Sequence, residues 1–171
     1  PAMLRPTCTF VIAGHSERRA IFAEDDELIG RKVKAIMEHG MTPILCVGES
    51  LAQREAGQAH QVVTRQLSAA IARIESAHFA NLVVAYEPVW AIGTGIAALP
   101  ADAAEMTAAI RETLRSLDPV GADQVRLIYG GSVTTESAPT LLGQENIDGA
   151  LVGGASLSAV DFLAIAQAAR R

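Results

Sequence analysis

Short apolar runs alternate along the chain with longer segments in which apolar residues recur every three or four positions. The apolar runs are Cys8–Gly14, Thr42–Val47, Leu82–Tyr86, Val125–Tyr129 and Gly149–Val152. The amphipathic segments that follow them extend approximately over Asp25–His39, Leu51–Ala77, Pro100–Leu117, Thr134–Leu142 and Ala159–Arg170. Continuous apolar strands that alternate with helices are typical of a parallel sheet covered by helices. The pattern therefore predicts an α/β fold of about five parallel strand–helix units, in one domain over residues 1–171.

Glycine and proline refine the boundaries of the predicted helices. Gly40 follows the last apolar position of the first helix, where a helix commonly ends. Gly57 is expected to divide the second amphipathic segment into a short helix and a longer one. Pro100 suits the first turn of a helix, because its missing N–H would have no partner there in any case.

Polar or glycine residues follow every apolar run. They are Gly14-His15, Gly48-Glu49, Glu87-Pro88, Gly130-Gly131-Ser132 and Gly153-Gly154. The carboxyl ends of parallel strands meet at one edge of a sheet, and α/β folds bind their ligands there. The repetition of such residues, more than any single pair, predicts a ligand site at this edge.

The loop after the third run is EPVWAIGTGIAALP, in which a carboxylate is followed by an apolar stretch and two glycines. The apolar stretch from Val89 to Ile92 could cover a ligand, while Gly93 and Gly95 could present backbone N–H groups at close range. A bare GTG would more often be an ordinary βα loop. The whole string instead favours a loop that closes as a lid above a bound ligand.

Composition and charge narrow the functional classes. Half of the 171 residues are hydrophobic, the formal net charge is −5 and the pI is about 5.3, which argues against a nucleic-acid-binding surface. No run of 18 apolar residues predicts a membrane span, and the start of the chain lacks the pattern of a signal peptide. Cys8 and Cys46 fit no metal-binding spacing, and both are expected to be buried strand residues. These features predict a cytoplasmic protein that contacts neither nucleic acid nor membrane.

Five motifs together resemble the triosephosphate isomerase family. The run AYEPVWAIGTG (Ala85–Gly95) looks like the family's catalytic-base strand and flexible lid. Four further motifs are similar in order and spacing: GHSERR (14–19), CVGE (46–49), YGGSV (129–133) and LVGGASL (151–157). The resemblance covers essentially the whole chain. It implies part of a (β/α)8 barrel, namely the C-terminal portion without the first three strand–helix units.

The resemblance also implies a reaction and a set of residues. The family interconverts dihydroxyacetone phosphate and glyceraldehyde 3-phosphate, in glycolysis and gluconeogenesis, through an enediolate and without metal or organic cofactor. Such a reaction needs a base that moves a proton between adjacent carbons and a donor for the enediolate oxygen. By resemblance the base is Glu87 and the donor is His15, which the family keeps as a neutral imidazole at a helix N-terminus. The phosphate-binding residues would be Gly93, Ser132, Gly153 and Gly154. Supporting residues around the site and the lid would be Glu17, Glu49, Trp90 and Tyr129.

Two departures from the family pattern stand out. The lid of the family normally ends in lysine-threonine-alanine, whereas this chain reads Ile96-Ala97-Ala98. The family's lysine beside the substrate has no counterpart, since the two lysines, Lys32 and Lys34, fall inside the first predicted helix. We therefore expect impaired turnover by this chain alone.

Length adds an expectation about assembly. A complete eight-stranded barrel takes about 250 residues, so five units are expected to leave unpaired edges on the first and last strands. Such edges favour a homo-oligomer or association with a complementing N-terminal fragment. A truncated, non-catalytic phosphate-binding or folding module that self-associates is the main alternative function. Another phosphate-binding barrel enzyme is a weaker one, which no motif supports.

Overall fold

The computed structural model describes residues 1–74, 76–92 and 98–169, and its strands form one open parallel sheet. The strand order is β1-β2-β3-β4-β5, so that each strand pairs with the next one along the chain. The strands are β1 (Phe10–Ala13), β2 (Thr42–Val47), β3 (Val83–Tyr86), β4 (Arg126–Tyr129) and β5 (Gly149–Ala150). This arrangement confirms the predicted α/β class with five parallel strands.

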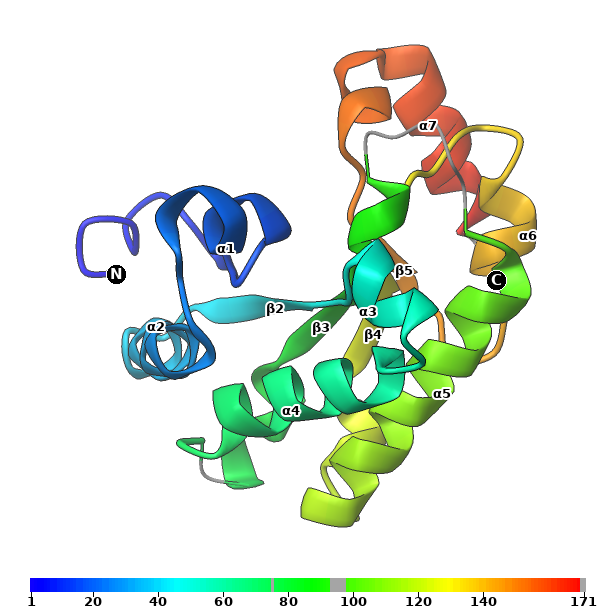
Figure 1. The fold of residues 1–171 in the computed structure, drawn as a ribbon. Helices are drawn as coiled ribbons and strands as arrows, with labels where there is room; N and C mark the ends of the chain where they lie inside the picture. The colour runs from blue at the N-terminus through cyan, green and yellow to red at the C-terminus, as the bar shows by residue number, and fades with distance from the viewer. Residues whose placement is uncertain (75, 93–97, 170–171) are drawn as a thin grey trace.

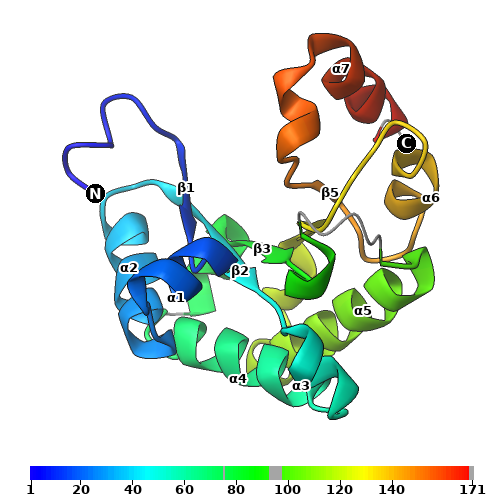
Figure 2. The ribbon, with the colours of Figure 1, turned by 45° about the horizontal axis from the view of Figure 1, so that its top comes forward.

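Helices connect the strands and lie mainly along one side of the sheet, where they form an arc around it (Figures 1 and 2). They are α1 (Ser16–Phe22), α2 (Asp26–Glu38), α3 (Leu51–Glu55), α4 (Ala59–Ile71), α5 (Pro100–Leu117), α6 (Ala138–Leu142) and α7 (Ala159–Ala168). Short 3-10 turns span Ser76–Asn81, Val89–Ala91, Ala122–Gln124 and Gly154–Leu157.

The two faces of the sheet differ in how well they are covered. Side chains alternate along a strand, and the register places Leu45, Val84 and Leu127 on the face that the helices cover, where all are buried. The opposite face, here called the inner face, carries Phe10 and Ile12, which remain 48% and 45% exposed. The core therefore lies between sheet and helices, and the inner face at β1 is open to solvent.

The first predicted helix matches the structure closely. Asp25 caps α2 by accepting a hydrogen bond from the N–H of Leu28 at 2.8 Å. Gly40 follows the helix with φ of +69°, a conformation that costs glycine little. Ile29, Val33 and Ile36 face the core, as their spacing predicted.

Several predicted boundaries were wrong. The strand predicted from Cys8 begins only at Phe10, because the backbone N–H of Cys8 bonds the Leu4 carbonyl in a turn. Cys8 is accordingly half-buried outside the strand, while Cys46 is buried inside β2, as expected. The predicted strand over Gly149–Val152 pairs only over its first two residues.

The later helices are also shorter than predicted. Gly57, with φ of +70°, does separate α3 from α4, but α4 ends at Ile71 instead of continuing toward Ala77. The helix predicted from Thr134 begins at Ala138, because Thr134 and Ser137 bond each other's backbone N–H in a turn. The last helix ends at Ala168, two residues before the predicted Arg170, which lies outside the described residues.

No helix in the described part of the chain is both long and apolar enough to cross a membrane.

Candidate active site

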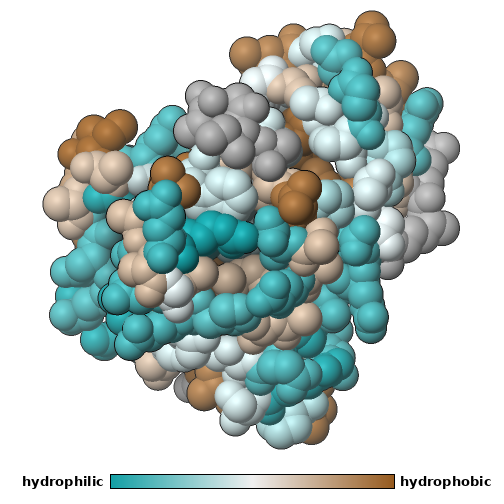
Figure 3. Space-filling model, turned by 45° about the vertical axis from the view of Figure 1, so that its right-hand side comes forward, coloured by the Kyte–Doolittle hydropathy of each residue, from teal (hydrophilic) through white to brown (hydrophobic). Residues whose placement is uncertain are grey.

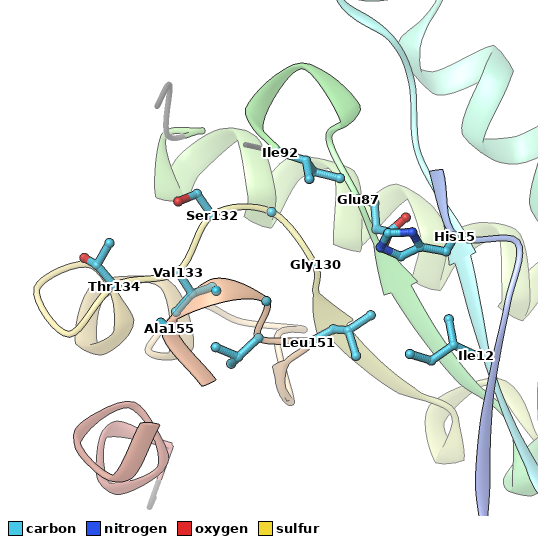
Figure 4. Close-up of a pocket in the computed structure, with 14 residues that line it drawn as sticks. Ile12, His15, Glu87, Ile92, Gly130, Ser132, Val133, Thr134, Leu151 and Ala155 are labelled. Atoms are coloured by element: carbon cyan, nitrogen blue, oxygen red, sulfur yellow. The ribbon is translucent and has the colours of Figure 1, made fainter. Parts of the chain in front are cut away.

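A cavity of about 460 Å³ opens at the carboxyl ends of the strands (Figure 4). His15 and Glu87 lie side by side in one part of it, and the chain after β4 and β5 forms the other part. The lining residues are Ile12, His15, Glu87, Ile92, Gly130–Thr134 and Leu151–Ala155. Of the polar and glycine residues that the sequence predicts at this edge of the sheet, the cavity lining includes His15, Glu87, Gly130–Ser132, Gly153 and Gly154. Gly48 and Glu49 are not among the described residues that line it.

Glu87 directly follows β3, and backbone contacts fix its position. Its N–H donates to the Val47 carbonyl at 2.8 Å, which extends the pairing of β3 with β2 by one residue. A Cβ on Gly48 would lie 1.7 Å from the Glu87 carbonyl oxygen, and one on Gly130 would lie 2.8 Å from Glu87 Cγ. Glycine at both positions thus lets the two neighbouring strands enclose the Glu87 side chain, which is 2% exposed.

The Glu87 carboxylate contacts the beginning of α1 through both oxygens. Oε2 accepts the backbone N–H of Ser16 at 3.1 Å, and Oε1 lies 3.2 Å from Nε2 of His15. Burial raises the pKa of Glu87, and the nearby His15 and the Ser16 N–H partly oppose that shift. A carboxylate whose pKa is raised toward neutral pH is better suited to accept a proton from carbon.

His15 caps the N-terminus of α1 with its own ring. Its Nδ1 accepts the backbone N–H of Glu17 at 3.3 Å. A ring nitrogen that accepts a hydrogen bond carries no proton, so the proton of the neutral imidazole lies on Nε2. Nε2 lies 3.2 Å from Oε1 of Glu87, and His15 lines the cavity, so the ring can donate a hydrogen bond to a group bound there.

Glu49 is completely buried and accepts hydrogen bonds from two aromatic side chains. Nε1 of Trp90 donates to Oε1 at 2.8 Å, and the Tyr86 hydroxyl lies 3.2 Å from each carboxylate oxygen. Arg54 adds a cation at 3.5 Å and places its guanidinium over the Trp90 ring. Burial and the Glu49 charge raise the pKa of Tyr86, so that its hydroxyl remains a donor. This group holds the beginning of the loop after β3 against the end of β2.

Tyr129 lies at the end of β4 and is buried beside Tyr86, with the two rings edge to face. Burial raises its pKa to about 12, and the backbone N–H of Ala98 opposes the shift. Ala98 directly follows residues 93–97 in the loop between β3 and α5. Tyr129 therefore contacts the C-terminal part of the loop whose N-terminal part contains Trp90. Glu17, in contrast, is exposed and contributes only its N–H to the site.

The predicted phosphate-binding residues are only partly covered by the structure. Ser132, Gly153 and Gly154 all line the cavity. Gly93, the fourth predicted residue, lies outside the described part of the chain. Ile96 and Ala97, at the predicted lid hinge, lie outside it as well. Nothing within 4 Å would obstruct a Cβ on Gly153 or Gly154, so their backbone faces open space.

The lysines occupy the positions in α2 that the sequence predicted, away from the cavity. Nζ of Lys32 bonds the buried carboxylate of Glu24, and Nζ of Lys34 lies 3.7 Å from Glu38. No lysine or arginine appears among the described residues that line the cavity. The described residues likewise contain no cluster of three or more His, Cys, Asp or Glu that could hold a metal ion.

Several residues that the sequence does not predict support the site through backbone atoms. Ser16 acts through its N–H, and Gln66 bonds both the N–H and the carbonyl of Gly48. Arg19 bonds the carbonyls of Gly14 and Cys46. No spacing or composition signal points to such contacts, because they depend on how distant segments pack.

Comparison with known proteins decides the family. The family model described as triosephosphate isomerase matches residues 1–169. The chain belongs to the triosephosphate isomerase family. A triosephosphate isomerase from Roseiflexus sp. (strain RS-1) is 56% identical over 167 residues, which cover 96% of this chain and 66% of the relative. Triosephosphate isomerases from Dechloromonas aromatica and Chloroflexus aurantiacus are 53% and 52% identical, over 95% and 96% of this chain and 65% and 66% of the relatives.

These matches confirm the resemblance that the five motifs suggested. The chain spans slightly less than two thirds of the length of these triosephosphate isomerases. The open five-stranded sheet is consistent with part of the family's barrel.

Proposed function

We propose that this chain carries the proton-transfer site of a triosephosphate isomerase, acting on dihydroxyacetone phosphate and glyceraldehyde 3-phosphate. The observation that carries the proposal is the pair formed by Glu87 and His15 in the cavity, with Oε1 and Nε2 3.2 Å apart. One member is a buried carboxylate with a raised pKa, and the other is an imidazole with its proton directed into the site.

Glu87 acts in the proposed reaction as the base. It removes a proton from the carbon next to the substrate carbonyl and returns it to the neighbouring carbon, so that one carboxylate serves both half-reactions. A bound substrate would displace the hydrogen bond between Ser16 and Glu87 and free the carboxylate to reach carbon.

His15 stabilises the negative charge that develops on the substrate oxygen. Its Nε2–H donates to that oxygen in the enediolate, where charge is greatest, so the interaction is stronger in the transition state than in the ground state. The hydrogen bond from Glu17 to Nδ1 holds the proton on Nε2.

The phosphate group would be bound largely by backbone N–H groups on the far side of the cavity from His15. Ser132 follows β4, Gly153 and Gly154 follow β5, and all three residues line the same cavity. Glycine permits close approach of the backbone to phosphate oxygens. We include Gly93 of the loop after β3 in this set on the basis of the motif.

The loop after β3 would close over the bound substrate and exclude water. We assign Glu49 and Trp90 to holding one end of this lid and Tyr129 to the other, on the contacts described above. Glu17 would support the polar site from the surface of α1.

Turnover by this chain alone is proposed to be impaired. The cavity lining that the structure describes supplies no cation to oppose the substrate phosphate and the enediolate charge. We further propose that the open inner face at β1 is covered in the working protein, by a second copy or by a complementing segment.

A coupled assay for isomerisation of glyceraldehyde 3-phosphate tests the proposal directly. Glu87→Gln keeps the shape of the side chain but removes the base, so we expect the rate to fall about 10²- to 10⁴-fold relative to wild type. Glu105→Gln, at an exposed position on α5, is the matched control and should retain the wild-type rate. Equal background rates for wild type and Glu87→Gln would rule out turnover by this chain and favour the non-catalytic module.

A further inference from the structure

Helix α1 carries His15 at its N-terminus, yet it is not held by packing. None of its seven residues is buried, and Ile21 and Phe22 are 70% and 62% exposed. A helix of this length has little stability of its own, and helices normally gain it by burying an apolar face. Polar contacts must therefore fix the position of α1, and with it the position of the His15 ring.

Arg19 joins α1 to the turn before it and to two other elements, β2 and α2. Nε donates to the Gly14 carbonyl at 2.9 Å, and Nη2 donates to the Cys46 carbonyl in β2 at 3.4 Å. Nη1 donates to Oδ1 of Asp26, at the start of α2, at 2.6 Å. The side chain is 19% exposed. The rigid, planar fork of a guanidinium suits several fixed acceptors at once.

The acceptors of Arg19 adjoin the residues that form the candidate active site. Gly14 directly precedes His15 and has φ of +80°, and a Cβ there would approach the Cys46 carbonyl oxygen to 3.0 Å. Arg19 thus holds the turn before His15 against the end of β2. The same helix start donates the Ser16 N–H to Glu87 and the Glu17 N–H to His15.

Arg18, the neighbouring cation, makes a different set of contacts. It bonds Glu24, a buried residue just after α1, and its guanidinium lies over the Phe22 ring. These contacts stay within α1 and the segment after it. Of the two arginines, Arg19 alone bonds both the turn before His15 and β2 in the contacts described.

We infer that Arg19 is a positioning residue for the His15–Glu87 pair: by joining the carbonyls of Gly14 and Cys46 it holds the start of α1 so that Nε2 of His15 stays beside the Glu87 carboxylate, which favours the proton on Nε2. The inference deepens the proposed function and rests on it for its catalytic meaning. Its geometric content, the state of the His15 ring, can be measured without any turnover.

The experiment measures the ¹⁵N chemical shifts of the His15 ring in the full chain at about pH 8.5, roughly two units above the ordinary imidazole pKa. A His15→Gln variant assigns the signals. In wild type we expect a strong excess of the Nε2–H tautomer. In Arg19→Met we expect the fraction of the Nδ1–H tautomer to rise at least about threefold, because Nε2 then loses its fixed position beside the Glu87 carboxylate, which favours a proton on it.

Arg65→Met is the matched control. Arg65 contacts the same carboxylate, with Nε 3.2 Å from Oδ2 of Asp26, but it touches neither Gly14 nor Cys46 in the contacts described. The tautomer ratio in this variant should equal that of wild type. A wild-type ratio in folded Arg19→Met, or an equal shift in Arg65→Met, would overturn the inference.

If circular dichroism shows that Arg19→Met does not fold, the tautomer ratio is measured in Arg19→Lys instead. A lysine keeps the charge beside Asp26, but its single nitrogen cannot reproduce the fork that reaches both carbonyls. A shifted ratio supports the inference, and a wild-type ratio contradicts it. The ring signals do not depend on catalysis. A failure of the isomerase assay would therefore not change the tautomer result, and an unchanged tautomer ratio in Arg19→Met would not bear on the isomerase assay.

Discussion

Glu87 shows at the scale of single residues how a charged group can be buried at the end of a strand. Its two neighbours in space, Gly48 and Gly130, have no side chain, and their backbones lie directly against it. In place of water, the carboxylate accepts a hydrogen bond from the Ser16 N–H and lies beside the His15 ring. Burial with only partial compensation leaves its pKa raised.

Gly48→Ala tests this close packing. The added methyl group would overlap the backbone of Glu87, which cannot move aside as a flexible side chain would. We expect the free energy of unfolding to fall by about 3 kcal/mol or more, the upper part of the usual range for overpacking. Urea denaturation followed by circular dichroism measures the change.

Gly154→Ala serves as the stability control for this substitution. A Cβ at that position meets no atom within 4 Å, so its effect on the free energy of unfolding should be within about 0.5 kcal/mol. Equal losses in the two variants would contradict the packing argument.

At the scale of elements, Gln66 joins helix α4 to the end of β2. Its Oε1 accepts the Gly48 N–H at 2.8 Å, and its Nε2 donates to the Gly48 carbonyl at 3.1 Å. Gln66 is itself buried, so both backbone groups of Gly48 depend on it for hydrogen bonds. The helix thereby fixes the strand end that lies against Glu87.

Gln66→Leu should lower the free energy of unfolding by at least about 2 kcal/mol, because two backbone groups lose their partner at about 1–3 kcal/mol each. Gln61→Leu, at an exposed position of the same helix, should change it by no more than about 0.5 kcal/mol. Thermal and urea unfolding of both variants measure the difference. A neutral Gln66→Leu would show that water replaces the side chain.

The elements also show what the sequence could and could not predict. Apolar runs such as Thr42–Val47 and helix signals such as Asp25 and Gly40 predicted elements well, because local chemistry determines them. The end of β5 and the start of α6 were missed, because pairing partners and turn hydrogen bonds decide them. The positions of Glu87 and His15 followed from motifs at strand ends, whereas Arg19 and Gln66 act on backbone groups of segments distant in the sequence.

At the scale of the whole molecule, the open sheet leaves apolar surface at both of its ends. Phe10 and Ile12 are exposed on the inner face of β1, where the Arg126 guanidinium lies over the Phe10 ring. On α7, Val160 and Leu163 are 78% and 58% exposed. Hydrophobic side chains gather at the top of the surface in Figure 3, the end of the molecule where α7 lies. Apolar patches of this kind favour association.

Light scattering should therefore give a mass above the 17.9 kDa of one chain at micromolar concentration. Val160→Glu places a charge on the apolar surface of α7 and should shift the population toward the monomer, while Gln167→Glu, on the same helix, should not. A stable monomer for the unchanged chain would contradict this account of its surface.

The most direct test of the central claim follows the proton that Glu87 is proposed to move. The chain is incubated with dihydroxyacetone phosphate in D₂O, and proton NMR measures the exchange of hydrogen for deuterium at the carbon that bears the hydroxyl group. The account predicts exchange above the buffer rate with wild type, and a loss of that exchange with Glu87→Gln. Exchange at equal rates in the two proteins would contradict it.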